Sequence, residues 1–173
     1  MITKTGYKLF EMDECGNLYP LFIDKNTIIP VDNWVQAEIH VTRGFAARPG
    51  FHIGEIPAAP WLMSADGTYK SQRRKKWKRV WAKVEYIANN DYTDYVQTLP
   101  GKCMKDMLPY NGFYKFRETG CNRIWIIADY MKIIQVLNED ERMEVLKAMD
   151  YDEVKAFEPY KAAFEKRMKT TVA

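Results

Sequence analysis

The stretch RIWIIADYMKIIQVL, residues 123–137, holds two short apolar runs that Asp129 and Tyr130 separate. Runs of this length, rich in isoleucine, are typical of buried β-strands. Just upstream, Asn111–Gly112 predicts a turn that leads into another short strand. The segment RVWAKVEYI at 79–87 alternates in hydrophobicity, which also predicts a strand. These segments together indicate a β-sheet.

The first third of the chain adds further extended segments. Residues 6–24 predict a β-hairpin, because alternating residues flank DECGN, a run of turn-forming residues. Asn33 is placed to cap a short helix that carries Trp34 and Val35. Glycine and proline punctuate residues 43–61, which predicts a strand with irregular flanks.

The sequence changes character after residue 137. Asn138 and Glu141 fit a capping box at the start of a helix. The spacing of Val145, Leu146 and Met149 predicts the buried stripe of that helix. Helical periodicity then continues toward the end of the chain, which indicates a helical region of residues 138–173.

A second capping signal, Asp150 with Glu153, predicts another helix inside this region. Its inward-pointing residues are expected to be Val154 and Phe157, and Pro159 is expected to kink or restart it. A β-rich body of residues 1–137 followed by packed helices is an α+β arrangement. Since 173 residues fit one domain, we expect a single domain overall.

Composition excludes several classes of protein. Hydrophobic residues make up 47% of the chain, which is typical of a globular domain and argues against disorder. No apolar run approaches the roughly 20 residues of a membrane helix, and the first residues lack a signal pattern, so we expect a cytoplasmic protein without membrane contact. Three widely spaced cysteines and no CxxC or HxxxH pair argue against disulfides and a metal site.

Positive charge is concentrated in one segment, KSQRRKKWKRVWAK at 70–83, which holds eight cations and no acid, while the whole chain carries only +3. Such a segment could bind an acidic protein or the phosphates of a nucleic acid. Alternatively, it could be a solvated loop. Trp77 could stack on exposed bases. The candidate contact residues are Arg73, Arg74, Lys75, Lys76, Trp77, Lys78 and Arg79.

A second candidate site lies in ARPGFHIGEIPAAPW, residues 47–61. His52 has a near-neutral intrinsic pKa, and its neighbours Phe51 and Ile53 are expected to face the core. His52 therefore faces either a cleft or solvent. Glycines such as Gly54 would let a ligand approach the backbone, and Arg48 could contact an anionic group. Alternatively, His52 is a surface histidine beside turn glycines.

RPGFHIGEIPAAP and WIIADYMKI also resemble a family of uncharacterised proteins from phages and mobile elements of gut bacteria, over roughly residues 7–137. This resemblance implies an accessory protein in the cytoplasm of the bacterial host cell. Its partner would be a host protein or nucleic acid.

The chain also resembles the ADP-ribosyltransferase fold, through YKLF near its start and WIIADYMKIIQVL. That resemblance implies a twisted, split antiparallel β-sheet and NAD as a cofactor. His52 would contact NAD, Tyr86 or Tyr92 would stack on the nicotinamide, and Glu85 would be the nearest carboxylate. The sequence departs from the fold's pattern at two positions. Glu11 stands where a basic residue suits the fold, and Asn122–Ile124 contains no acid, so catalysis stays open.

Overall fold

The computed structural model describes residues 1–40, 42, 48–118 and 123–172. Cys121, Asn122 and part of the predicted segment 43–61 lie outside the described residues. Within these ranges there are nine strands: β1 (Thr3–Met12), β2 (Leu18–Tyr19), β3 (Trp34–Gln36), β4 (Phe51–Gly54), β5 (Lys78–Ile87), β6 (Asn90–Asp91), β7 (Gly112–Arg117), β8 (Ile124–Ala128) and β9 (Tyr130–Val136). The helices are η1 (Pro60–Leu62), α1 (Thr93–Gln97), η2 (Pro100–Lys102), α2 (Glu139–Ala148) and α3 (Glu153–Val172).

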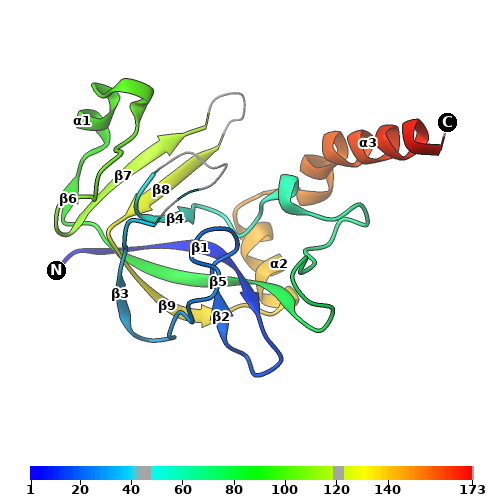
Figure 1. Ribbon diagram of the computed structural model, residues 1–173, viewed down its shortest axis with the longest axis horizontal. Coiled ribbons are helices and arrows are strands. Elements are labelled where there is room, and N and C mark those ends of the chain that lie inside the picture. Colours follow the sequence, from blue (N-terminus) through cyan, green and yellow to red (C-terminus); the bar gives the residue numbers. More distant parts are fainter. Residues whose placement is uncertain (41, 43–47, 119–122, 173) are drawn as a thin grey trace.

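The described strands form one mixed, mostly antiparallel sheet in the order β3-β9-β5-β1-β4-β8-β7-β6, with β2 paired to β1. Only β6 and β7 run parallel. The longest ladder joins β1 to β5, from Thr3↔Ile87 to Met12↔Lys78. The helices α2 and α3 follow the last strand (Figure 1). The predicted α+β class, with helices at the C-terminal end, is confirmed.

One bent segment links the two halves of the sheet. Asp129 alone separates β8 from β9. However, β8 pairs with β4 and β7, whereas β9 pairs with β5 and β3. The two apolar runs predicted at 123–137 are therefore confirmed as strands, and they lie in different halves. The largest core cluster contains residues from both halves: Phe10, Ile53, Val84, Tyr86, Ile126, Met131 and Ile133, among others.

The predicted hairpin forms, with Glu11 opposite Tyr19, although its second strand is only two residues long. The short helix expected after Asn33 is wrong. Trp34–Gln36 is strand β3, paired with β9 through Val35↔Met131. Aromatic and β-branched residues fit a sheet better than a helical turn, so tertiary pairing prevails over the capping signal.

The helices are partly as predicted. The capping box of Asn138 and Glu141 is present, and Leu146 is buried. Met149, expected in the buried stripe, is 43% exposed. This exposure follows from its position at the end of α2, where it is the C-cap residue.

Helix α3 starts later than predicted. The carboxylate of Asp152, not of Asp150, accepts a hydrogen bond from the Lys155 amide at 3.0 Å. Asp150 instead has a φ of 53° in the turn between the helices. Phe157 is buried as predicted, but Val154 is 76% exposed, so its predicted inward position is wrong.

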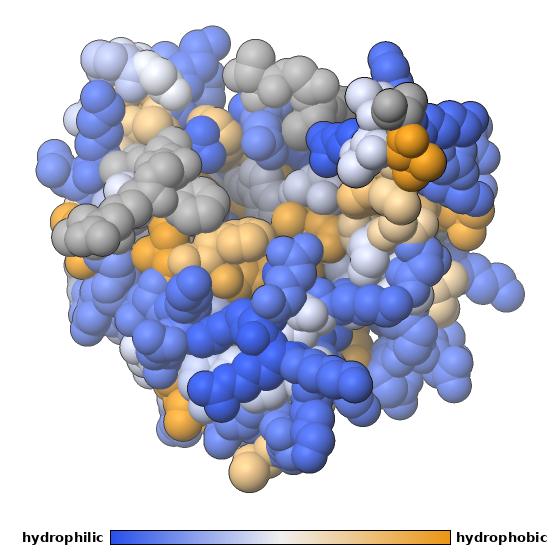
Figure 2. Space-filling model, turned by 45° about the vertical axis from the view of Figure 1, so that its right-hand side comes forward, coloured by the Kyte–Doolittle hydropathy of each residue, from blue (hydrophilic) through white to orange (hydrophobic). Residues whose placement is uncertain are grey.

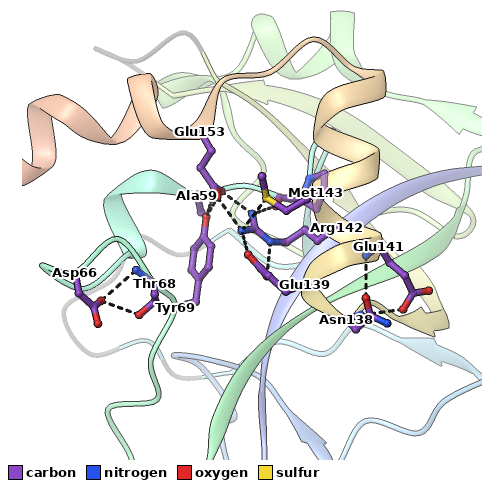
Figure 3. Close-up of polar contacts among 11 residues, drawn as sticks. Ala59, Asp66, Thr68, Tyr69, Asn138, Glu139, Glu141, Arg142, Met143 and Glu153 are labelled. Atoms are coloured by element: carbon purple, nitrogen blue, oxygen red, sulfur yellow. Dashed lines mark hydrogen bonds and ion pairs between the residues drawn. The ribbon is translucent and has the colours of Figure 1, made fainter.

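A buried polar network joins the two helices to each other and to the segment around η1 (Figure 3). Arg142 on α2 donates to both carboxylate oxygens of Glu153 on α3, at 2.6 and 2.8 Å, and to the Pro57 carbonyl at 3.0 Å. Tyr69 donates its hydroxyl to Glu153 at 2.9 Å and accepts from the Ala59 amide at 2.8 Å. The network thus joins the helices to the segment around η1.

Candidate functional site

A cavity opens where the two halves of the sheet part. The strands β1 and β4 pair only at Tyr7↔Gly54. Beyond that pair, the cavity of about 390 Å³ is lined by Lys8, Leu9 and Phe10 of β1 and by Phe51 and His52 of β4. This volume lies in the range of small-molecule sites. The face drawn in Figure 2 shows hydrophobic side chains gathered in a hollow between hydrophilic margins.

Lys8 is the most unusual residue of the cavity. Its Nζ donates to the His52 carbonyl at 3.0 Å and lies 5.9 Å from the centre of the Phe10 ring. Within the described part of the chain, no carboxylate forms an ion pair with Lys8, and burial lowers the pKa of its ammonium to about 8. A half-buried cation without a counter-ion costs free energy, so Lys8 is suited to receive an anionic group from a ligand.

The position of Lys8 explains this environment. It lies two residues from the fully buried Phe10, so both side chains project from the same face of β1. Continuing the β1–β4 ladder beyond Tyr7 would give the His52 carbonyl a backbone donor. Because the strands part there, the ammonium of Lys8 supplies the hydrogen bond instead.

His52 lines the same cavity. One ring nitrogen, Nε2, lies 3.1 Å from the carbonyl oxygen of Arg48, which requires that this nitrogen carry the proton. Burial, reinforced by the positive charge of Lys8, lowers the pKa of His52 to about 4. His52 is therefore neutral at physiological pH. Its neighbour Ile53 is fully buried on the opposite face, as predicted.

Arg48 adds a second cation. Its guanidinium lies 4.2 Å from the centre of the Phe116 ring. The Nε atom is buried and has no hydrogen-bond partner among the described residues. The two acids of the lining, Asp24 and Glu38, lie 3.6 and 4.0 Å from His40. Arg48 and Lys8 thus place two cations in the lining of the cavity.

Aromatic side chains form much of the remaining lining. Trp61 and Trp125 contact each other edge to face, with ring centres 5.9 Å apart. Trp81 is 4% exposed, and its indole Nε1 has no hydrogen-bond partner among the described residues. An unsatisfied buried donor in a cavity wall is a second position suited to a ligand acceptor. The lining combines apolar rings with a few unmatched donors, as ligand sites do.

The residues that sequence reasoning proposed for this site are only partly brought together. Arg48 and His52 line the cavity, whereas Gly54 is not among the lining residues and pairs with Tyr7 of β1. Glu85 and Tyr86 are not among the lining residues. Glu85 is paired with Lys132 at 3.3 Å.

Tyr86 is a core residue, 3% exposed, with its ring 5.5 Å from that of Phe113. Burial raises the pKa of Tyr86 to about 12. The resemblance implies a Tyr86 ring that stacks on a bound nicotinamide. In the structure, the protein encloses this ring instead.

Residues of the basic segment have divided roles. Arg79 is buried and paired with the fully buried Glu11 at 2.9 Å. Trp77 stacks on Tyr19 with ring centres 4.9 Å apart, and the guanidinium of Arg73 lies over both rings. The exposed cations among the candidate contact residues are Arg74, Lys75, Lys76 and Lys78.

Sequence reasoning missed Lys8 and Trp81 as cavity residues. The available signal was the alternation in GYKLFE, which places Lys8 on the same face of the strand as Phe10. Nothing local indicates that β4, more than forty residues away, leaves this face open.

The acid sensitivity of the fold tests the environment of His52. Because its pKa is about 4 in the folded protein, against 6.5 ordinarily, the unfolded chain takes up this proton first as the pH falls from 6.5 to 4. Stability is therefore lost through that window. His52→Gln should lose less stability between pH 7 and pH 4.5 than the wild type, by on the order of 2 kcal/mol in urea unfolding.

The comparison variant is His40→Gln at the other histidine, in which the loss of stability that comes from His52 should remain. Equal acid sensitivity in the wild type and His52→Gln would contradict the buried, neutral state of His52.

Among the described residues, no three His, Cys, Asp or Glu side chains gather as a metal site would require. No helix within the described ranges combines the length and apolar character needed to cross a membrane. Comparisons with protein-family models, with curated proteins and with solved structures give no match.

Proposed function

We propose that this protein binds a small anionic ligand carrying an aromatic or apolar ring, in the cavity between the two halves of its sheet. The observation that carries the proposal is Lys8, a cation set among apolar residues whose hydrogen-bond acceptor is a backbone carbonyl. A ligand phosphate or carboxylate would supply the missing negative charge.

A nucleotide of the NAD kind is the first candidate. Its phosphates suit Lys8 and Arg48, and its flat rings suit a wall that includes Trp61, Trp81 and Trp125. The parting of β1 from β4 after one residue pair supports a split sheet like that of the ADP-ribosyltransferase fold. The proposal is thus an ADP-ribosyltransferase-like binding domain.

The proposed activity is binding without group transfer. A transferase of this kind would need a free carboxylate beside the bound ligand. Asp24 and Glu38 in the lining already lie beside His40, and Glu85 is paired with Lys132 outside the cavity.

Isothermal titration with NAD, ADP-ribose and inorganic pyrophosphate tests the proposal. Lys8→Met should weaken binding about tenfold or more, because a hydrogen bond to a charged group contributes about 1.5–3 kcal/mol. Lys4→Met is the matched control, an exposed lysine on the same strand, and should bind as the wild type does. Binding of all three ligands to Lys8→Met with unchanged affinity would refute the role of Lys8.

The pH dependence of ligand affinity distinguishes binding at Lys8 from binding at a surface lysine. Because the pKa of Lys8 is about 8, its ammonium loses its proton as the pH rises through 8. Affinity should therefore fall between pH 7 and pH 9 in the wild type. An exposed lysine, with an ordinary pKa near 10.5, would keep its charge over this range.

The alternative, a module that binds nucleic acid or an acidic partner through residues 70–83, is supported by the exposed Arg74, Lys75 and Lys78. Its test is fluorescence anisotropy with labelled single-stranded DNA. Binding that disappears in Arg74→Glu/Lys75→Glu/Lys78→Glu, falls steeply with salt and persists in Lys8→Met would favour this alternative.

A further inference from the structure

The apolar stripe of α3 continues beyond the body of the protein. Glu153 and Phe157 are 8% and 7% exposed, since the start of the helix packs against the body near η1. Tyr160, Phe164 and Met168 extend the same face at spacings of three and four residues. Met168 is 67% exposed. Figure 1 shows α3 leading away from the sheet.

Such a projecting helix is expected to need a partner. Residues 158–172, the part of α3 beyond Phe157, have a length at which an isolated helix gains little stability in water, and most helical stability comes from packing an apolar face. The residues of α3 after Phe157 have no fully buried side chain among them. The stripe of Tyr160, Phe164 and Met168 is therefore available for packing against another helix.

A complementary surface lies at the other end of the same helix. A groove between α2 and the start of α3 is lined by the carboxylates of Asp140, Glu144, Asp150 and Asp152 and by one lysine, Lys147. Two of its apolar residues are exposed, Met143 at 46% and Val154 at 76%, while Leu146 is buried.

The far end of α3 has the opposite charge. Residues 165–169, EKRMK, carry three cations and one acid around Met168. The basic, apolar end of the helix thus matches the acidic, apolar groove. The two cannot meet within one molecule, because α3 is one continuous helix that separates Val154 from Met168 by about 21 Å.

We propose that two copies of this chain associate through antiparallel α3 helices, with the basic end of each helix against the acidic groove of its partner. This arrangement is isologous, so it closes as a dimer and leaves neither end unmatched. Antiparallel pairing is favoured because a parallel pair would place the two basic ends together. The proposal is independent of the cavity and of the ligand proposed for it.

Sedimentation velocity tests the dimer. The wild type should be dimeric at about 100 μM, where a micromolar association is nearly complete. Phe164→Glu/Met168→Glu should be monomeric, with the helix content by circular dichroism showing whether α3 remains folded. Ala162→Glu is the matched control, because Ala162 is exposed on the opposite side of α3, and it should remain dimeric.

Reversing charges identifies the partner surface. Lys166→Glu/Arg167→Glu/Lys169→Glu and Asp140→Lys/Glu144→Lys should each be monomeric alone, because each repels its own complementary surface. An equimolar mixture should form a heterodimer, since both tail-to-groove contacts then join opposite charges. A wild type that stays monomeric at about 100 μM, or charge variants that fail to pair when mixed, would overturn the proposal.

Discussion

Replacing Arg142 with methionine is expected to destabilise the protein by about 3–5 kcal/mol, the cost of removing one partner of a buried ion pair. Arg142 is 3% exposed and contacts Glu153, Glu139 and the Pro57 carbonyl. Without it, the carboxylate of Glu153, which is 8% exposed, would keep only the hydroxyl of Tyr69 as a donor among the described residues. The Pro57 carbonyl would also lose the hydrogen bond that it accepts from Arg142.

Urea unfolding of Arg142→Met measures this loss as a fall in midpoint. Lys147→Met is the control, because Lys147 is exposed on the same helix, and it should change stability by no more than about 0.5 kcal/mol. Arg142→Met/Glu153→Gln should recover part of the loss, since the glutamine leaves no unpaired charge and can still accept from Tyr69. A loss below about 1 kcal/mol in Arg142→Met would contradict a role in fastening the helices.

The strands could be predicted from sequence because alternation and isoleucine-rich runs are local signals. Segments 79–87 and 123–137 both form strands as expected. Their order in the sheet could not be predicted. Although only Asp129 separates β8 from β9, β8 pairs with β4 and β9 pairs with β5, in the other half of the sheet. The cavity depends on that order. Arg48 and His52 were recognisable as candidates from their loop, whereas the role of Lys8 depends on its long-range relation to β4.

Errors in the helical region have a local cause. The N-terminal cap of α3 is Asp152 and not Asp150, and the face of α3 toward the body carries Glu153 and Phe157. Val154 lies about 100° around the helix from Glu153. Val154 then points outward and Glu153 inward, toward Arg142. Because capping residues such as aspartate recur at short intervals here, the sequence alone allows both starts. The start at Asp152 is favoured by the buried salt bridge between Arg142 on α2 and Glu153 on α3. That salt bridge depends on how the two helices pack, which is not a local property of the sequence.

Arg79→Met is expected to cost about 3–5 kcal/mol, although Arg79 belongs to a run of apparently equivalent cations. Its partner Glu11 is completely buried, and the two residues are opposite each other in the β1–β5 ladder. Removing Arg79 would leave a carboxylate in the interior without its counter-ion. Lys78→Met, the exposed neighbour, should change the free energy of unfolding by no more than about 0.5 kcal/mol.

The pH dependence of Arg79→Met gives a sharper test than its stability at one pH. Without Arg79, the carboxylate of Glu11 would be buried without its counter-ion, and a buried carboxyl group costs less free energy in its neutral form than in its charged form. The penalty relative to the wild type is then largest at pH 8 and smaller at pH 5. Glu11→Gln/Arg79→Met should recover stability at pH 8 and lose this dependence. A penalty that is constant from pH 5 to pH 8 would show that Arg79 acts through packing of its side chain rather than through its charge.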